Sequence, residues 1–127
     1  MKSIRIMVLT MIALGLVFSG TFAADVEKGK ALFNDPKLGG ATSGKSCGSC
    51  HPDGKGLENA ADKKEFNIMG KKQKGLEGAV NFCIEMALKG KAIDPKGADM
   101  ANIVAYIKSL KGKPAATPKK KKAIEGC

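Results

Sequence analysis

Aromatic side chains are scarce in this chain, which has no Trp, one Tyr and five Phe in 127 residues. Its one Arg is Arg5, so nothing later offers the guanidinium forks with which proteins read DNA bases. Binding to single-stranded nucleic acid would need exposed aromatic rings for base stacking, and these are equally few. The composition therefore argues against a nucleic-acid partner.

Other signals of catalysis and of β-structure are missing too. His51 is the only histidine, and no acid–base pair in a recognisable setting and no nucleotide-binding loop accompany it. The sequence has no internal repeat and no alternating strand pattern of any length. These absences favour a small all-α protein that is not an enzyme.

The first 23 residues have the layout of a cleavable export signal. Lys2 and Arg5 precede an apolar run over 6–18, and Thr21 and Ala23 place small side chains at the two positions that a signal peptidase reads. The run is too short for a comfortable membrane span. We expect cleavage after Ala23, with an uncleaved anchor as the alternative, and a periplasmic or otherwise exported protein without a stable membrane span.

We expect one domain over residues 24–110 and a Lys-rich disordered tail over 111–127. The tail has six Lys against Glu125 and supplies a large part of the formal net charge of +10. A weakly basic domain with a basic tail is suited to transient docking on redox partners with an acidic surface, or on another anionic surface. A domain this small, with few aromatic residues, would gain stability from disulfides, a metal or a large apolar cofactor.

Three segments have helical patterning, namely 25–33, 76–89 and 98–110, of which the last follows the i, i+3, i+4, i+7 spacing most cleanly. Residues 38–46 are rich in Gly, Ser and Thr and predict a loop. A short helical turn is expected over 60–65, in an otherwise polar stretch. The predicted fold class is therefore all-α, with about four short helices and long loops.

The segment Cys47-Gly48-Ser49-Cys50-His51 has a specific chemical meaning, because Cys-x-x-Cys-His is the attachment sequence for c-type haem. The two thiols add across the vinyl groups of the porphyrin and form two thioether bonds. The histidine that follows becomes the proximal iron ligand. We therefore expect one covalently bound haem c, held by Cys47, Cys50 and His51.

Three other uses of these residues stay open. A thioredoxin-like redox pair would sit in a βαβ setting, which the sequence lacks. A structural zinc site could recruit Cys47, Cys50, His51 and Cys83, although adjacent residues rarely ligate one ion. A plain disulfide between Cys47 and Cys50 could form in an oxidising compartment.

With its flanking segments, the motif resembles the class I cytochrome c fold from about Asp25 to Leu110. Residues 26–33 look like the N-terminal helix of that family, and residues 103–108 look like its C-terminal helix. In the family these helices cross where a Gly allows close approach. The resemblance implies that four core residues meet at this crossing: Gly29, Phe33, Ile103 and Tyr106.

The chain departs from the best-known members of that family in two ways. The link over 34–46 is longer than usual, and there is no Met-Pro pair, the usual mark of the distal Met ligand. Residues 80–91, with Asn81-Phe82-Cys83, are instead similar to haem domains of the sulfur-oxidising group, such as thiosulfate dehydrogenases and SoxAX cytochromes. In that group the Cys of the Asn-x-Cys segment can be the distal ligand.

Several side chains compete for the distal position on the iron. Cys83 is the first choice, and its thiolate would lower the reduction potential because negative charge favours ferric iron. Its other interpretation is a small buried hydrophobic residue. Met86 and Met100 are the alternative distal ligands, and each could also be a core residue. Met69, in a polar loop, is a further candidate behind these. Cys127 is given no role.

These inferences predict a mono-haem c-type cytochrome that carries single electrons between redox partners outside the cytoplasm. Two alternatives remain. The chain could be the haem subunit of an enzyme complex that oxidises sulfur compounds, or a haem-based redox or gas sensor.

Overall fold

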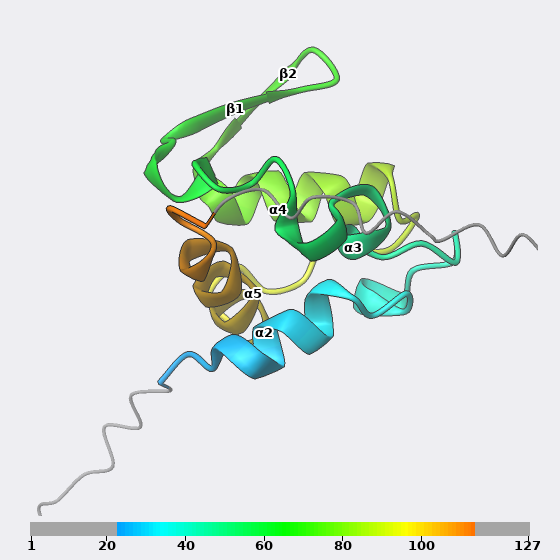
Figure 1. Cartoon of the computed structure of the whole chain (residues 1–127). Helices are drawn as coiled ribbons and strands as arrows, with labels where there is room; N and C mark the ends of the chain where they lie inside the picture. The colour runs from blue at the N-terminus through cyan, green and yellow to red at the C-terminus, as the bar shows by residue number, and fades with distance from the viewer. Residues whose placement is uncertain (1–22, 114–127) are drawn as a thin grey trace, which may run out of the picture.

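The computed structural model describes residues 23–113, and Figure 1 shows several short helices with one small hairpin beside them. The elements in chain order are α2 (Val26–Phe33), a 3-10 turn (Leu38–Gly40), α3 (Cys47–Cys50), two further 3-10 turns (Pro52–Gly54 and Ala60–Asp62), β1 (Glu65–Ile68), β2 (Lys71–Lys74), α4 (Gly75–Met86) and α5 (Ala98–Ser109). Apart from their inner ends, the expected signal and tail lie outside the described residues. No helix within 23–113 is both long and apolar enough to cross a membrane.

The start of α2 is fixed by polar contacts. The Asp25 carboxylate accepts hydrogen bonds from the backbone N–H groups of Glu27 (2.9 Å) and Lys28 (3.1 Å), which caps the helix. The Asp25 N–H in turn donates to Oδ1 of Asn102 on α5, at 2.7 Å. The first residues of the domain are thereby tied to its last helix.

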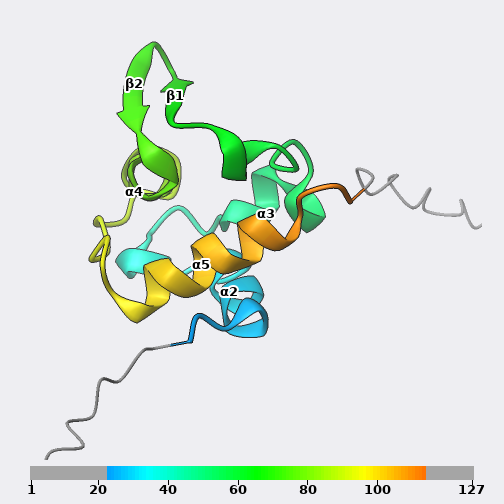
Figure 2. The same cartoon turned by 90° about the vertical axis from the view of Figure 1, so that its left-hand side faces the viewer.

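Helices α2 and α5 lie side by side in both views (Figures 1 and 2), and their backbones approach closely at Gly29. A Cβ atom on Gly29 would overlap the backbone of Asn102 and lie 2.9 Å from Cβ of Tyr106. The rings of Phe33 and Tyr106 pack with centroids 5.1 Å apart and planes tilted by 59°. Ile103 is fully buried in the same core. The predicted helix crossing is therefore confirmed, and it depends on a residue without a side chain.

The prediction of an all-α protein is wrong in one respect, because residues 65–74 form an antiparallel hairpin. Glu65 pairs with Lys74 at one end and Ile68 with Lys71 at the other. The intervening Met69 and Gly70 both have positive φ, at 53° and 77°, as the two-residue turns typical of hairpins require. The helical turn expected over 60–65 is shorter than predicted and ends at Asp62, before β1 begins.

Helix α4 lies beneath the hairpin and ends three residues earlier than the sequence pattern predicts. Lys89 adopts a left-handed conformation (φ 58°), and the N–H of Gly90 donates to the carbonyl of Ile84 at 3.0 Å. This reversal turns Leu88 into the core, where it is 2% exposed. Residues 87–97 then connect α4 to α5.

Candidate functional site

A largely apolar cavity of about 260 Å³ lies between the hairpin, α4 and the other helices. It is lined by residues from six separate parts of the chain: Phe33, Cys47, His51, Leu57, Phe66, Ile68, Leu76, Ala79, Val80, Cys83 and Ile107. Three of these are predicted site residues, namely Cys47, His51 and Cys83. The fold therefore brings Cys83 to the same cavity as His51, which lies 32 positions earlier in the sequence.

His51 is held at the end of α3 by its backbone and by its ring. Its N–H donates to the carbonyl of Cys47 at 2.9 Å, and its Nδ1 lies 3.0 Å from the carbonyl oxygen of Lys55. A carbonyl can only accept, so this contact requires the proton on Nδ1. The lone pair of Nε2 is then free to bind a metal.

The turn after His51 requires glycine at one position. Gly54 has a φ of 78°, and a Cβ atom there would overlap the side chain of Leu110. The Gly54 N–H donates to the carbonyl of His51 at 2.8 Å. The segment that carries the Lys55 carbonyl back to the imidazole is thus packed against the end of α5.

Cys47 and Cys50 begin and end the single helical turn of α3. Before them, the Ser46 N–H donates to Oγ of Ser49 at 3.0 Å and the two hydroxyls lie 3.2 Å apart, which fixes this turn. Cys47 is half-buried at the cavity, and burial, together with the nearby Cys83, raises the pKa of its thiol to about 11. Cys50 is exposed, and both thiols are free.

Cys83 reaches the same cavity from α4. Its thiol is free and partly buried, and burial is the main cause that raises its pKa, followed by the proximity of Cys50. A raised pKa favours the protonated thiol, and a bound metal ion would displace that proton. Cys83 thus lies in an apolar cavity near other thiols, and its sulfur is a soft donor atom for a metal ion.

Asn81, two residues before Cys83, fixes the orientation of α4 relative to the chain that follows it. Its amide donates to the carbonyl of Ile93 at 2.8 Å, and its Oδ1 accepts the Ile93 N–H at 2.9 Å. The Lys91 N–H also donates to the carbonyl of Gly39, at 2.8 Å. The sequence carries no signal for this role of Asn81, because its partners are backbone groups.

The methionine candidates for the distal position lie elsewhere. Met86 is at the end of α4 and 41% exposed, and Met69 is at the hairpin turn and 77% exposed. Met100 is 1% exposed within the hydrophobic core. None of the three lines the cavity that contains His51, whereas Cys83 does.

The residues of the cavity fit a haem group. Its walls are mostly aliphatic and aromatic, as a porphyrin face requires, and the donor atoms are an imidazole and a thiol from different elements. Within residues 23–113, no three His, Cys, Asp or Glu side chains are grouped so that they could hold a metal ion by themselves. If a haem were bound here, His51 and Cys83 would supply donor atoms and the apolar side chains would cover the ring.

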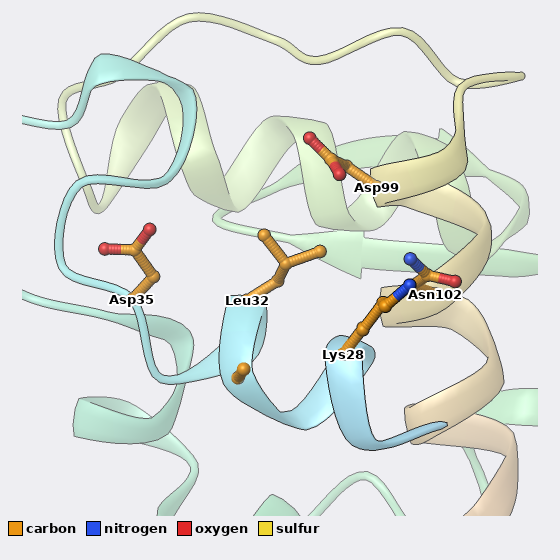
Figure 3. Close-up of a pocket in the computed structure, with 6 residues that line it drawn as sticks. Lys28, Leu32, Asp35, Asp99 and Asn102 are labelled. Atoms are coloured by element: carbon orange, nitrogen blue, oxygen red, sulfur yellow. The ribbon is translucent and has the colours of Figure 1, made fainter. Parts of the chain in front are cut away.

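A second cavity, of about 400 Å³, opens between α2 and the start of α5 (Figure 3). Its lining residues are Lys28, Ala31, Leu32, Asp35, Asp99 and Asn102. No predicted site residue lies there. The cavity next to α3 and α4 is therefore the candidate site.

Sequence reasoning did not identify the hairpin side of the site. Phe66 and Ile68 line the cavity from β1, and Leu57 lines it from the preceding loop. The signal for β1 was present but short, because two apolar residues two positions apart precede Met69 and Gly70. Periodicity over only four residues does not distinguish a strand from a loop.

Comparison with known proteins points to one enzyme. The chain is 38% identical over 92 residues to the L-cysteine S-thiosulfotransferase subunit SoxA of Chlorobaculum thiosulfatiphilum, and 36% identical to the subunit of the same name from Chlorobaculum tepidum. Each match covers 70% of this chain but 29% of the relative, so the chain spans less than a third of the length of these proteins. No family model and no solved structure matches the chain.

These similarities support a relation to SoxAX-type cytochromes, the group that the Asn81-Phe82-Cys83 segment indicated. Both relatives are subunits of an enzyme. The comparisons therefore favour the enzyme-subunit alternative of the sequence analysis over a free electron carrier.

Proposed function

We propose that this chain is a mono-haem c-type cytochrome unit that acts outside the cytoplasm as a subunit of an enzyme complex that oxidises sulfur compounds. The observation that carries this proposal is that Cys83 lines the same apolar cavity as Cys47 and His51 of the attachment motif. The similarity to two SoxA subunits supports the sulfur chemistry and the presence of partner subunits.

Three residues would hold the haem c. Cys47 and Cys50 would form the thioethers, and Nε2 of His51 would be the proximal ligand. The bound group would supply one-electron oxidation and reduction. The Lys55 carbonyl would keep the proton on Nδ1 and set the orientation of the ring, which makes the imidazole a stronger donor.

Cys83 is the proposed distal ligand. Its place in the cavity supports this choice over Met86 and Met100, which do not line it. As a thiolate it would add negative charge beside the iron and lower the reduction potential. The apolar side chains of Phe66, Ile68 and Val80 would exclude water and make that charge more effective.

A free electron carrier is the second candidate. Cys50 is exposed, so the edge of a haem attached to it would lie near the surface, where a redox partner can exchange electrons. This role needs the cavity and the attachment motif but no sulfur substrate.

Two measurements test the proposal. Protein exported with its haem-maturation system should stay red after denaturation, because thioether bonds survive unfolding; a colourless protein would refute haem attachment. The red protein, supplied with thiosulfate, L-cysteine and an electron acceptor, together with subunits purified with it, should form S-thiosulfocysteine. Electron exchange without this product in the complete complex would support the carrier instead.

A further inference from the structure

The hairpin is the most strongly basic exposed segment among the described residues. Five lysines lie within or immediately before it, and all are exposed: Lys63, Lys64, Lys71, Lys72 and Lys74. The segment 63–74 contains one acidic residue, Glu65. Within residues 23–113 the ion pairs are Lys28–Asp25 and Lys111–Asp62, so none of the five ammonium groups forms an ion pair in this part of the chain.

The same hairpin has an apolar side chain at its tip. Met69 is 77% exposed and has a left-handed backbone conformation, which holds it at the turn. Exposed Met is enriched at protein-binding surfaces, and the lysines around it add positive charge that would steer an acidic partner to it. A single apolar residue gives little anchorage in a lipid bilayer, which favours a protein partner over a membrane.

The two faces of the hairpin have different environments. The register places Phe66 and Ile68 on the face that lines the cavity, with Lys71 paired to Ile68 at the exposed end of that face. Lys72 and Lys74 pair with Asn67 and Glu65 on the other face, which is exposed. A partner bound to the exposed face would therefore lie directly behind the wall of the candidate haem site. Figure 1 shows the hairpin projecting beyond α4, where a partner can approach it.

We propose that the hairpin 65–74, with Lys63 and Lys64, is the docking surface for a protein partner that has a cluster of carboxylates. Positive charges in this position would attract an acidic surface and orient it toward the cavity, and Met69 would pack against its apolar centre. The proposal rests on the proposed function only in placing a redox group behind the hairpin. The binding itself needs no redox chemistry.

The test uses the full chain with haem attached and a fluorescein-labelled polyglutamate peptide as the acidic probe. Binding is measured by fluorescence anisotropy at low and high salt, and its location by changes in amide NMR shifts. The variant K71Q/K72Q/K74Q removes three charges from the hairpin. The control K30Q/K37Q/K96Q removes three exposed charges from other parts of the domain. Both are also made with Lys119–Lys122 replaced by Gln, so that the tail does not mask the hairpin.

We expect the hairpin variant to bind about fivefold more weakly at low salt and the control less than about twofold, since each exposed pair contributes modestly. Shift changes should concentrate in residues 63–74, and salt should abolish the difference. Equal weakening in both variants, shift changes elsewhere, or tighter binding to phosphatidylserine vesicles than to the peptide would overturn the proposal. The haem spectrum of each variant should equal that of the parent, so a failure of haem attachment is recognised separately.

Discussion

Helices α2 and α5 meet through closely packed side chains, whereas the hairpin and α4 surround a cavity. At the α2–α5 crossing the contact is so close that Gly29 has no room for a methyl group, and Phe33 is 2% exposed. Around the cavity, Phe66, Ile68 and Cys83 are only partly buried. The first region maintains the fold, and the second leaves apolar surface for a bound group to cover.

The same substitution in the two regions gives the largest expected contrast. Phe33→Ala should lower the free energy of unfolding by about 4 kcal/mol, because the ring is almost fully buried and packs against Tyr106 at the crossing, so its loss enlarges the cavity that it lines. Phe66→Ala should cost about 1 kcal/mol, since its ring is already partly exposed. Urea unfolding of both variants measures this difference. Equal losses would mean that the hairpin is as important to the core as the helix crossing.

The closeness of the crossing is tested by adding one methyl group. Gly29→Ala should destabilise the protein by about 3 kcal/mol, because the new Cβ overlaps the backbone of Asn102, which cannot move aside. The matched control is Gly78→Ala in α4, where the nearest atom would be 3.9 Å away. This control should be neutral or stabilising by up to about 1 kcal/mol. A tolerated Gly29→Ala would contradict the described crossing.

In the region of the hairpin and α4, Asn81 allows a test of how α4 is anchored to the chain that follows it. Asn81→Ala leaves the N–H and carbonyl of Ile93 without their partners and should lower stability by about 2 kcal/mol. Hydrogen exchange in residues 87–97 should become faster than in α2. Asn67→Ala, on the exposed face of the hairpin, is the control and should change stability by less than about 0.5 kcal/mol. Unchanged exchange in 87–97 would refute the proposed anchoring.

The smallest expected effect concerns alkaline pH. Burial, and then the negative charges of Asp53 and Glu27, raise the pKa of Tyr106 above its usual 10.0. The unfolded chain therefore loses this proton first, so the stability contribution is complete below pH 10 and is lost as pH rises through the folded-state pKa. Above pH 10, the free energy of unfolding of Tyr106→Phe should fall less steeply with rising pH than that of the parent protein. Identical profiles would show that the phenol does not contribute.

Helices α2 and α5 could be predicted from the sequence because their signals are local. Apolar spacing places helices over 25–33 and 98–110, and Gly29 and Phe33 fit a known kind of crossing. The hairpin could not be predicted in the same way. Its alternation is limited to Phe66 and Ile68, β2 is mostly lysine, and Met69 is an unusual residue for a left-handed turn position.

Only part of the candidate site could be predicted from the sequence. Cys47, Cys50 and His51 belong to one short motif, and its chemistry can be recognised from the sequence alone. The walls come from distant segments, such as Phe66 and Ile107, which only the folded chain brings together. The partner of Asn81 is the backbone of Ile93, and backbone groups give no signal in a sequence.

The most direct test of the proposed site compares the ferric spectrum and reduction potential of the native protein with those of Cys83→Ala and Met86→Ala. If Cys83 is the distal ligand, Cys83→Ala should alter the ferric spectrum and raise the potential, because a negatively charged donor is lost. Met86→Ala, whose side chain does not line the cavity, should leave both nearly unchanged. An unchanged spectrum in Cys83→Ala would contradict the assignment.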